Sequence, residues 1–291
     1  MTYLYFFIGL SLLVAGGELL IRGALGFAKH WKISPMLAGL VIVGFGTSTP
    51  ELSVSLGAAL SGRADIAVGN AIGSNISNIL LILGLCAIIS PLIVHKAQIQ
   101  RDGLVMLAAT LLICLFSVSG SLQQAHGVLM LLVLCGYLGY SYWADQRETT
   151  PSGELHIQEA QALSRIPSRL PLITGFVIIG LATLVGGAQL LVSAAAEIAA
   201  GLGVSEAVIG LTLVAVGTSL PELTVSVIAT FRRHADVAVG NIIGSNIFNL
   251  LGILGVTSLI SELPLSARMI CFDQWVMLAA TVVALLFFYT G

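Results

Sequence analysis

Two short segments of the chain carry residue types that could bind a cation inside a membrane. Glu51 directly follows Pro50, and Glu222 directly follows Pro221. An ionisable side chain at membrane depth costs roughly 2.5–3.5 kcal/mol on insertion scales, so it persists where it pairs or has a function. Each proline also removes an amide donor and frees a backbone carbonyl one turn earlier, and such carbonyls can line a cavity or coordinate an ion. Glu51 and Glu222 are therefore the first candidates for cation ligands.

Hydroxyl and amide side chains accompany both glutamates. Ser74 and Asn78 stand four residues apart, as do Ser245 and Asn249, which places each pair on one helix face. No His or Cys belongs to the set, and an oxygen-only set suits Ca²⁺ or Na⁺ and disfavours zinc or copper. A single hydroxyl could instead bond to the carbonyl of the preceding turn, but the occurrence of the whole set twice favours ligation. The accompanying residues are Thr47, Ser48, Ser74, Asn78, Thr218, Ser219, Ser245 and Asn249.

These segments belong to an internal repeat with an offset of 171 residues. GTSTPELSVS from Gly46 aligns with GTSLPELTVS from Gly217, and ADIAVGNAIGSNISNILLILG from Ala64 aligns with ADVAVGNIIGSNIFNLLGILG from Ala235. Over 46–84 against 217–255, 25 of 39 positions are identical without a gap. Apolar composition alone would match Leu with Ile or Val, but not these Gly, Pro, Glu, Ser and Asn residues. The chain therefore arose by duplication.

The elements that position the two segments are predicted to be transmembrane helices. The chain is 57% hydrophobic and only 9% charged, whereas a soluble domain carries about 25% charged residues. A spanning helix needs about 20 apolar residues. Nine segments qualify: 3–28, 35–60, 66–90, 102–119, 126–143, 171–200, 206–230, 237–261 and 273–290. We therefore expect an all-α polytopic membrane protein.

The order of the spans divides the chain into two inverted repeats. Residues 1–143 hold five spans, 144–170 form a charged linker, and 171–291 hold four spans. Because five is odd, the second repeat enters the membrane from the opposite face, an architecture that places a binding site near the midplane on interrupted helices. The repeat offset would place a tenth helix near 296–314, beyond Gly291, so we expect it to be missing from this chain.

The basic residues predict the orientation of the spans. Ten fall on one side and two on the other, and the side richer in Lys and Arg is normally cytoplasmic. We therefore expect the N-terminus outside and the linker in the cytoplasm, most simply in the cell (inner) membrane. The ten are Arg22, Lys29, Lys32, Lys96, Arg101, Arg147, Arg165, Arg169, Arg232 and Arg233, and the two are Arg63 and Arg268.

At the motifs GTSTPE…GSNISN and GTSLPE…GSNIFN the sequence resembles the cation/Ca²⁺ exchanger superfamily, in its sodium/calcium exchanger branch, which includes bacterial and archaeal members. The resemblance implies that Glu51 and Glu222 bind Ca²⁺ and share Na⁺, and that Asn78 and Asn249 complete the centre. It also implies that the first and sixth spans slide across a fixed core. By the same resemblance, flanking Na⁺ sites would be lined by Thr47, Ser48, Ser74, Thr218, Ser219 and Ser245, with carbonyls near Gly44 and Ala215.

Two features refine the expected activity. Potassium-dependent relatives carry Asp where this chain has Asn249, so we expect no K⁺ dependence. Proton-coupled relatives have a different repeat signature, so the resemblance favours exchange of Na⁺ for Ca²⁺ over a Ca²⁺/H⁺ antiporter at the same site.

Other classes of function fit the sequence less well. A cation channel could share the oxygen-lined site, but inverted repeats with broken helices favour a transporter. An intramembrane enzyme could use the two glutamates as acid and base, but the chain has no HExxH or GxSxG motif. A net charge of −2 provides no basic field for nucleic acid. We therefore expect no enzyme activity and no cofactor, with Ca²⁺, Na⁺ and the lipid bilayer as the partners.

Overall fold

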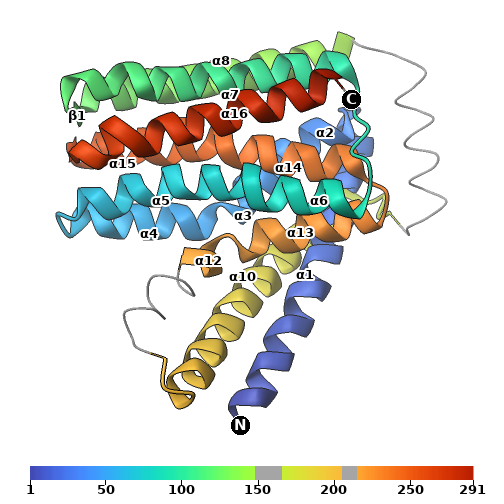
Figure 1. Ribbon diagram of the computed structural model, residues 1–291. Coiled ribbons are helices and arrows are strands. Elements are labelled where there is room, and N and C mark those ends of the chain that lie inside the picture. The colour runs from blue at the N-terminus through green and yellow to red at the C-terminus, as the bar shows by residue number, and fades with distance from the viewer. Residues whose placement is uncertain (148–165, 205–214, 291) are drawn as a thin grey trace.

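The computed structural model describes residues 1–147, 166–204 and 215–290, and nearly all of them are helical (Figure 1). The only sheet in these ranges is the antiparallel pairing of β1 (Ser121–Leu122) with β2 (Leu263–Pro264). The long helices are α1 (Thr2–Trp31), α4 (Thr49–Leu60), α5 (Ala64–Ser77), α7 (Lys96–Phe116), α8 (Gln124–Arg147), α10 (Leu170–Gly201), α13 (Leu220–Phe231), α14 (Ala235–Ile247) and α16 (Gln274–Thr290). The shorter ones are α2 (Pro35–Ala38), α3 (Phe45–Thr47), α6 (Gly84–Ile89), α12 (Ala215–Thr218) and α15 (Leu254–Ile260).

Short π-helical segments join several of these helices into continuous spans. They are η1 (Gly39–Gly44), η2 (Asn78–Leu83), η5 (Phe248–Ile253) and η6 (Met269–Asp273). Within the described ranges, seven helical stretches are long and apolar enough to cross a membrane, or eight when the bent pair Pro35–Thr47 and Thr49–Leu60 is taken as one span. The predicted all-α polytopic fold is therefore confirmed. The predicted span 206–230 begins in residues outside the described part and continues as α12 and α13.

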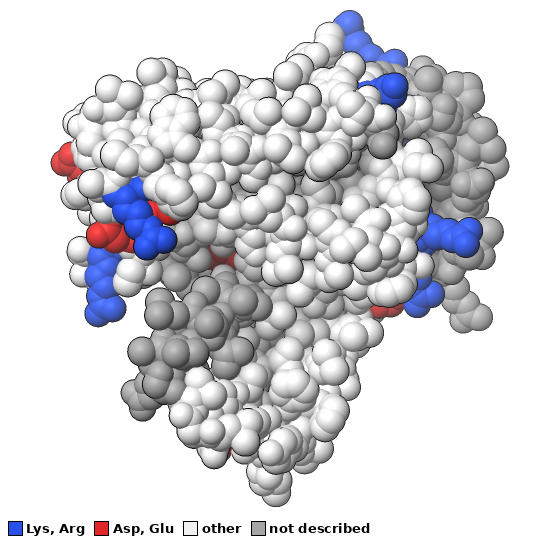
Figure 2. Space-filling view, in the orientation of Figure 1, with Lys and Arg blue, Asp and Glu red and all other residues white. Residues whose placement is uncertain are grey.

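The surface agrees with this membrane-spanning arrangement. Most helices of the main bundle lie side by side along one direction (Figure 1). Charged side chains gather near the two ends of that direction, and the middle of the visible face is nearly uncharged (Figure 2). Such a belt is what a lipid-facing surface requires, because charges are costly at membrane depth.

The bundle is built around α14, in which every residue from Val237 to Ile247 is buried. Glycines allow α14 to cross α2 and η1 at close range. A Cβ on Gly240 would overlap the carbonyl of Met36, and a Cβ on Gly244 would overlap the carbonyl of Leu40. Because those atoms belong to the backbone, they cannot move aside.

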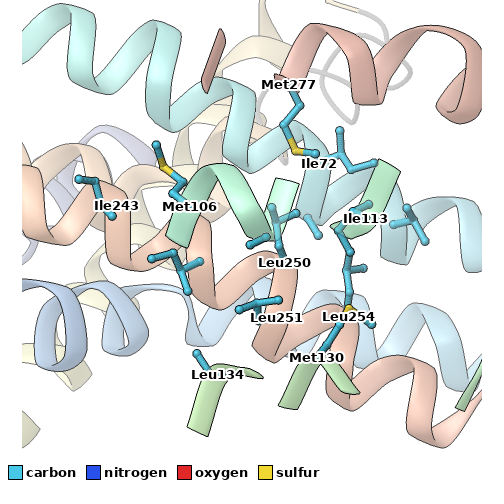
Figure 3. Packing of buried hydrophobic residues seen from close by; sticks show 14 of the residues in the cluster. Ile72, Met106, Ile113, Met130, Leu134, Ile243, Leu250, Leu251, Leu254 and Met277 are labelled. Atoms are coloured by element: carbon cyan, nitrogen blue, oxygen red, sulfur yellow. The ribbon is translucent and has the colours of Figure 1, made fainter. Parts of the chain in front are cut away.

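Apolar side chains from both repeats fill the core beside α14. Ile72 of α5, Met106 of α7 and Met130 of α8 meet Leu250 of η5 and Met277 of α16 in one cluster (Figure 3). The first and second repeats therefore share one hydrophobic core.

Helices α1 and α10 lie side by side and project from this bundle (Figure 1). They pack as an antiparallel pair through glycines spaced seven apart. A Cβ on Gly16 would lie 2.6 Å from the amide nitrogen of Leu184, and a Cβ on Gly187 would lie 2.8 Å from the amide nitrogen of Leu13. Such close backbone contact makes α1 and α10 one packing unit.

The end of α8 holds the connection between α1 and α2. The Ser34 amide donates to Asp145 Oδ2 at 2.8 Å, and Gln146 Nε2 donates to the carbonyl of Trp31 at 2.7 Å. Arg101 donates to Asp145 at 2.9 Å from α7. Helix α8 thus continues to Arg147, past the predicted start of the linker at 144, and the proposed division at 144–170 stays a prediction.

Candidate cation site

Both glutamates follow a break in a helix. The break in the first repeat falls at Ser48, where the two parts of the span meet at 44°. Ser219 occupies the matching position before α13, with φ −88° and ψ 2°. Pro50 cannot donate to the carbonyl of Gly46, and the Thr49 hydroxyl donates to that carbonyl at 2.8 Å instead. The carbonyl freed by Pro50 is thus satisfied locally.

The two carboxylates face hydroxyls of the opposite repeat. Glu51 and Glu222 are each only 1% exposed. The Ser48 hydroxyl donates to Glu222 Oε1 at 3.0 Å. Thr218 and Ser219 lie against the Glu51 carboxylate, which lies near Glu222. The structure therefore brings together the two glutamates that are 171 positions apart in the sequence.

The amides of Asn78 and Asn249 occupy equivalent positions in the two π-helical segments η2 and η5. Asn78 Nδ2 donates to Asn246 Oδ1 at 3.1 Å, and Asn249 Nδ2 donates to Asn75 Oδ1 at 3.0 Å. These hydrogen bonds use the amide nitrogens, so each amide turns its oxygen away from its partner. Asn75 and Asn246 therefore set the orientation of the two candidate ligands.

Four buried oxygen atoms of this site have no hydrogen-bond donor. In the described part of the chain, they are Glu51 Oε2, Glu222 Oε2, Asn78 Oδ1 and Asn249 Oδ1, and the only further buried atom without a partner is Ser141 Oγ. A buried acceptor without a donor costs about 1–3 kcal/mol, and more when it is charged. Two carboxylate and two amide oxygens form a set that a hard cation satisfies.

Asn70 and Asn241 anchor the two glutamate-bearing helices. Asn70 Nδ2 donates to the Glu51 carbonyl at 3.0 Å and to Ser55 Oγ at 2.9 Å. Asn241 Nδ2 donates to the Glu222 carbonyl at 3.2 Å and to its own serine partner, Ser226 Oγ, at 2.8 Å. Each asparagine thus fixes the backbone at the ligand that it supports.

Sequence analysis missed these supporting residues. They are Ser55, Asn70, Asn75, Ser226, Asn241 and Asn246. The sequence does contain a signal for them, because each is identical to its counterpart in the other repeat. Repetition marks a residue as constrained, but it does not separate a ligand from the residue that orients it.

The other predicted residues lie around this centre. Ser245 Oγ and Thr47 Oγ1 both donate to the carbonyl of Gly44, at 3.1 and 3.3 Å, so this carbonyl already has donors. Ser74 is buried on α5. Ala215 begins α12, and its side chain lies outside the described part, so its predicted role stays a prediction.

The site contains no cluster of metal-binding charges beyond the two glutamates. Across the described ranges, no three His, Cys, Asp or Glu side chains come together. The candidate ligand atoms are therefore mostly neutral oxygens in a poorly screened interior, where the charge on a bound cation matters strongly.

Comparison with known proteins places these features in a family. Residues 1–143 and 172–291 match the family described as "Sodium/calcium exchanger protein". The chain is 42% identical over 289 residues to the putative antiporter CaxA of Alkalimonas amylolytica, covering 97% of this chain and 88% of the relative. It is 32% identical over 324 residues to the sodium/calcium exchanger MaX1 of Methanosarcina acetivorans, covering 100% of this chain and 92% of that one.

A solved structure shows the same fold. The sodium-calcium exchanger NCX_Mj, soaked with zero Na⁺ and Ca²⁺, superposes with a TM-score of 0.85 at 35% identity. The match covers 99% of this chain and 91% of that one. The whole arrangement of helices, including both repeats, is therefore shared.

Proposed function

Because the chain belongs to the sodium/calcium exchanger protein family, we propose that it is a secondary active antiporter that exchanges Na⁺ for Ca²⁺. The ions would bind at the centre formed by Glu51, Glu222, Asn78 and Asn249. The observation that carries this proposal is the set of four buried oxygens, two from each repeat, that lack hydrogen-bond donors. A cation in their midst would satisfy all four.

Charge explains why Na⁺ and Ca²⁺ would exclude one another. Two carboxylates neutralise one Ca²⁺. Several Na⁺ could instead divide the same oxygens and the hydroxyls around them, among them Ser48 and Ser219. Ca²⁺ and several Na⁺ together would greatly exceed the two negative charges in a poorly screened interior. Mutual exclusion at one site couples the two ions, because each drives the other off.

The packing of α1 supports transport by alternating access. Val225 of α13 is 0% exposed beneath α1, whereas Val54, its counterpart on α4, is 37% exposed. The two inverted repeats therefore pack differently on α1 and α10. Sliding the α1–α10 pair across the bundle would exchange the two arrangements and move access to the site from one face to the other.

The predicted orientation gives this asymmetry a direction. With the N-terminus outside and the linker in the cytoplasm, the covered seam between α1 and α13 faces the cytoplasm. The present arrangement would then be the one that opens the site to the outside. The ions would enter from that side across the cell membrane.

Transport of ⁴⁵Ca²⁺ into proteoliposomes tests the proposal. Vesicles loaded with Na⁺ and diluted into Na⁺-free medium should accumulate Ca²⁺, and external Na⁺ should compete with it. Equal K⁺ gradients should have no effect. Uptake driven by a proton gradient and indifferent to Na⁺ would instead identify a Ca²⁺/H⁺ antiporter, and flux without any counter-ion would identify a channel.

A further inference from the structure

A group of charged residues joins the second half of α1 to the turn after α13. Glu18 of α1 accepts two hydrogen bonds from Arg22, at 2.9 and 2.7 Å. Its other carboxylate oxygen lies 3.3 Å from Nε of Arg232, the residue that follows α13. Glu18 thus bridges a helix of the α1–α10 pair to the main bundle.

A small cavity and a buried seam lie beside this bridge. The cavity, of about 170 Å³, is lined by these three residues together with Ile21, Phe231, Arg233 and His234. Burial lowers the pKa of His234, so near neutral pH the ring adds little positive charge. Ile21 is only 2% exposed. The bridge therefore closes over the covered seam between α1 and α13.

The sequence does not repeat these charges on the opposite face. The repeat offset matches Glu18 with Gln189, Arg22 with Ser193, and Arg232 with Ser61. None of these three counterparts is charged, although the flanking motifs are nearly identical, and the one charged counterpart in the cavity lining is Arg63, which matches His234. When α10 takes the position on α4 that α1 now holds on α13, Gln189 and Ser61 could not form the ion pair that Glu18 and Arg232 form.

We propose that Glu18, Arg22 and Arg232 form a one-sided latch that favours the arrangement in which α1 covers α13. This inference rests on the proposed alternating access. The pairs are partly exposed, Arg232 by 54% and Glu18 by 22%, and such pairs contribute little individually. The latch therefore biases an equilibrium between two arrangements by a few-fold and does not lock either one.

Two cysteine reporters measure this bias without any transported ion. In a chain with Cys86, Cys114, Cys135 and Cys271 replaced by Ala, Ile21→Cys reports the covered seam and Val54→Cys reports the exposed face of α4. Glu18→Gln should raise the rate at which a water-soluble maleimide labels position 21, by about three- to five-fold, and should lower the rate at position 54. A reciprocal change identifies a shift between two arrangements.

Charge reversal and a matched control complete the test. Arg232→Glu should act like Glu18→Gln, and Glu18→Arg combined with Arg232→Glu should restore both rates. Glu197→Gln, which removes a carboxylate from α10 outside the latch, should change neither. Unchanged rates in Glu18→Gln, or faster labelling at position 21 alone, would overturn the latch. Failure of the proposed function would appear separately, as absent Na⁺-driven ⁴⁵Ca²⁺ uptake in the unaltered chain.

Discussion

At the scale of single residues, the site is two copies of one local design. In each repeat a glutamate follows a break, an asparagine four residues after a serine presents its oxygen, and a further asparagine orients the corresponding amide of the other repeat. Neither copy is sufficient alone, because each repeat supplies one carboxylate and one free amide oxygen. The residue that orients a ligand in one repeat belongs to the other, as the bond from Asn78 to Asn246 illustrates.

The carboxylates are the most sensitive positions. Glu51→Gln and Glu222→Gln should each lower Ca²⁺ transport by at least about 100-fold, because one remaining carboxylate leaves Ca²⁺ half neutralised where screening is weak. The measurement is Na⁺-driven ⁴⁵Ca²⁺ uptake, with size-exclusion profiles to show that the variants fold. Asp65→Asn, a matched loss of an acid from the exposed start of α5, should transport normally. Near-normal exchange by either Gln variant would remove that glutamate from the centre.

Asn246 should matter although it presents no free oxygen. Asn246→Leu removes the acceptor that holds the Asn78 amide, so Asn78 can rotate and present its nitrogen to the cation. We expect apparent Ca²⁺ affinity about tenfold weaker, equivalent to about 1.4 kcal/mol. Affinity is read from the Ca²⁺ dependence of initial uptake. Asn246→Asp, which keeps the acceptor, should lose less; equal loss in both variants would argue against orientation as the cause.

Asn249 should decide the response to K⁺. The neutral amide keeps the site at two carboxylates, so uptake in the unaltered chain should be the same with and without K⁺. Asn249→Asp adds a third carboxylate and should introduce sensitivity to K⁺ on the same side as Ca²⁺. The comparison is uptake in K⁺ and in an impermeant organic cation at equal ionic strength. An absolute K⁺ requirement before substitution would contradict this interpretation.

At the scale of elements, glycines determine which helices can approach. Gly240 and Gly244 let α14 cross α2 and η1, which brings Ser245 to the carbonyl of Gly44. Gly16 and Gly187 join α1 to α10 in the same way. The contacts of α14 with α2 and η1 position residues of the site. The contacts between α1 and α10 join the two helices that we propose to move.

Gly186 and Gly187, which are adjacent on α10, offer a matched test of the contacts between α1 and α10. A Cβ on Gly187 would lie 2.9 Å from Leu12 Cβ and 3.0 Å from the carbonyl of Gly9, whereas a Cβ on Gly186 meets no described atom within 4 Å. Gly187→Ala should therefore overpack the pair at a cost of about 1–3 kcal/mol. We expect a thermal midpoint in detergent lower by several degrees and slower exchange. Gly186→Ala should change neither, and equal behaviour of the two variants would contradict a close α1–α10 contact.

At the scale of the whole molecule, inverted repeats make the two faces equivalent in outline but not in detail. Charged residues gather at both ends of the bundle (Figure 2), and the predicted order of the spans places the excess of Lys and Arg at one of them. Val225 is buried whereas its counterpart Val54 is exposed, so the two repeats occupy different arrangements in one structure. We expect the asymmetry of charge to set the orientation, and in the proposed transport cycle the asymmetry of packing would set the side from which the site is open.

The orientation can be tested in intact cells. In the chain without native cysteines, Arg63→Cys should react with an impermeant maleimide added outside, because we expect the turn before α5 to face outward. Arg165→Cys, in the predicted cytoplasmic linker, should react only after permeabilisation. Efficient labelling of position 165 from outside would reverse the assigned topology.

The sequence by itself determined the membrane class and the duplication, and it singled out the two glutamates that the structure brings together. These follow from composition and from polar residues that are identical at one repeat offset. Neither requires any knowledge of the contacts between helices. The tertiary structure decided which repeated residues present oxygen and which orient it, because Asn75 and Asn78 differ only in what lies opposite each of them. The tertiary structure also decided that Glu18 reaches Arg232, since an ion pair between residues 214 positions apart depends on how α1 packs against the bundle.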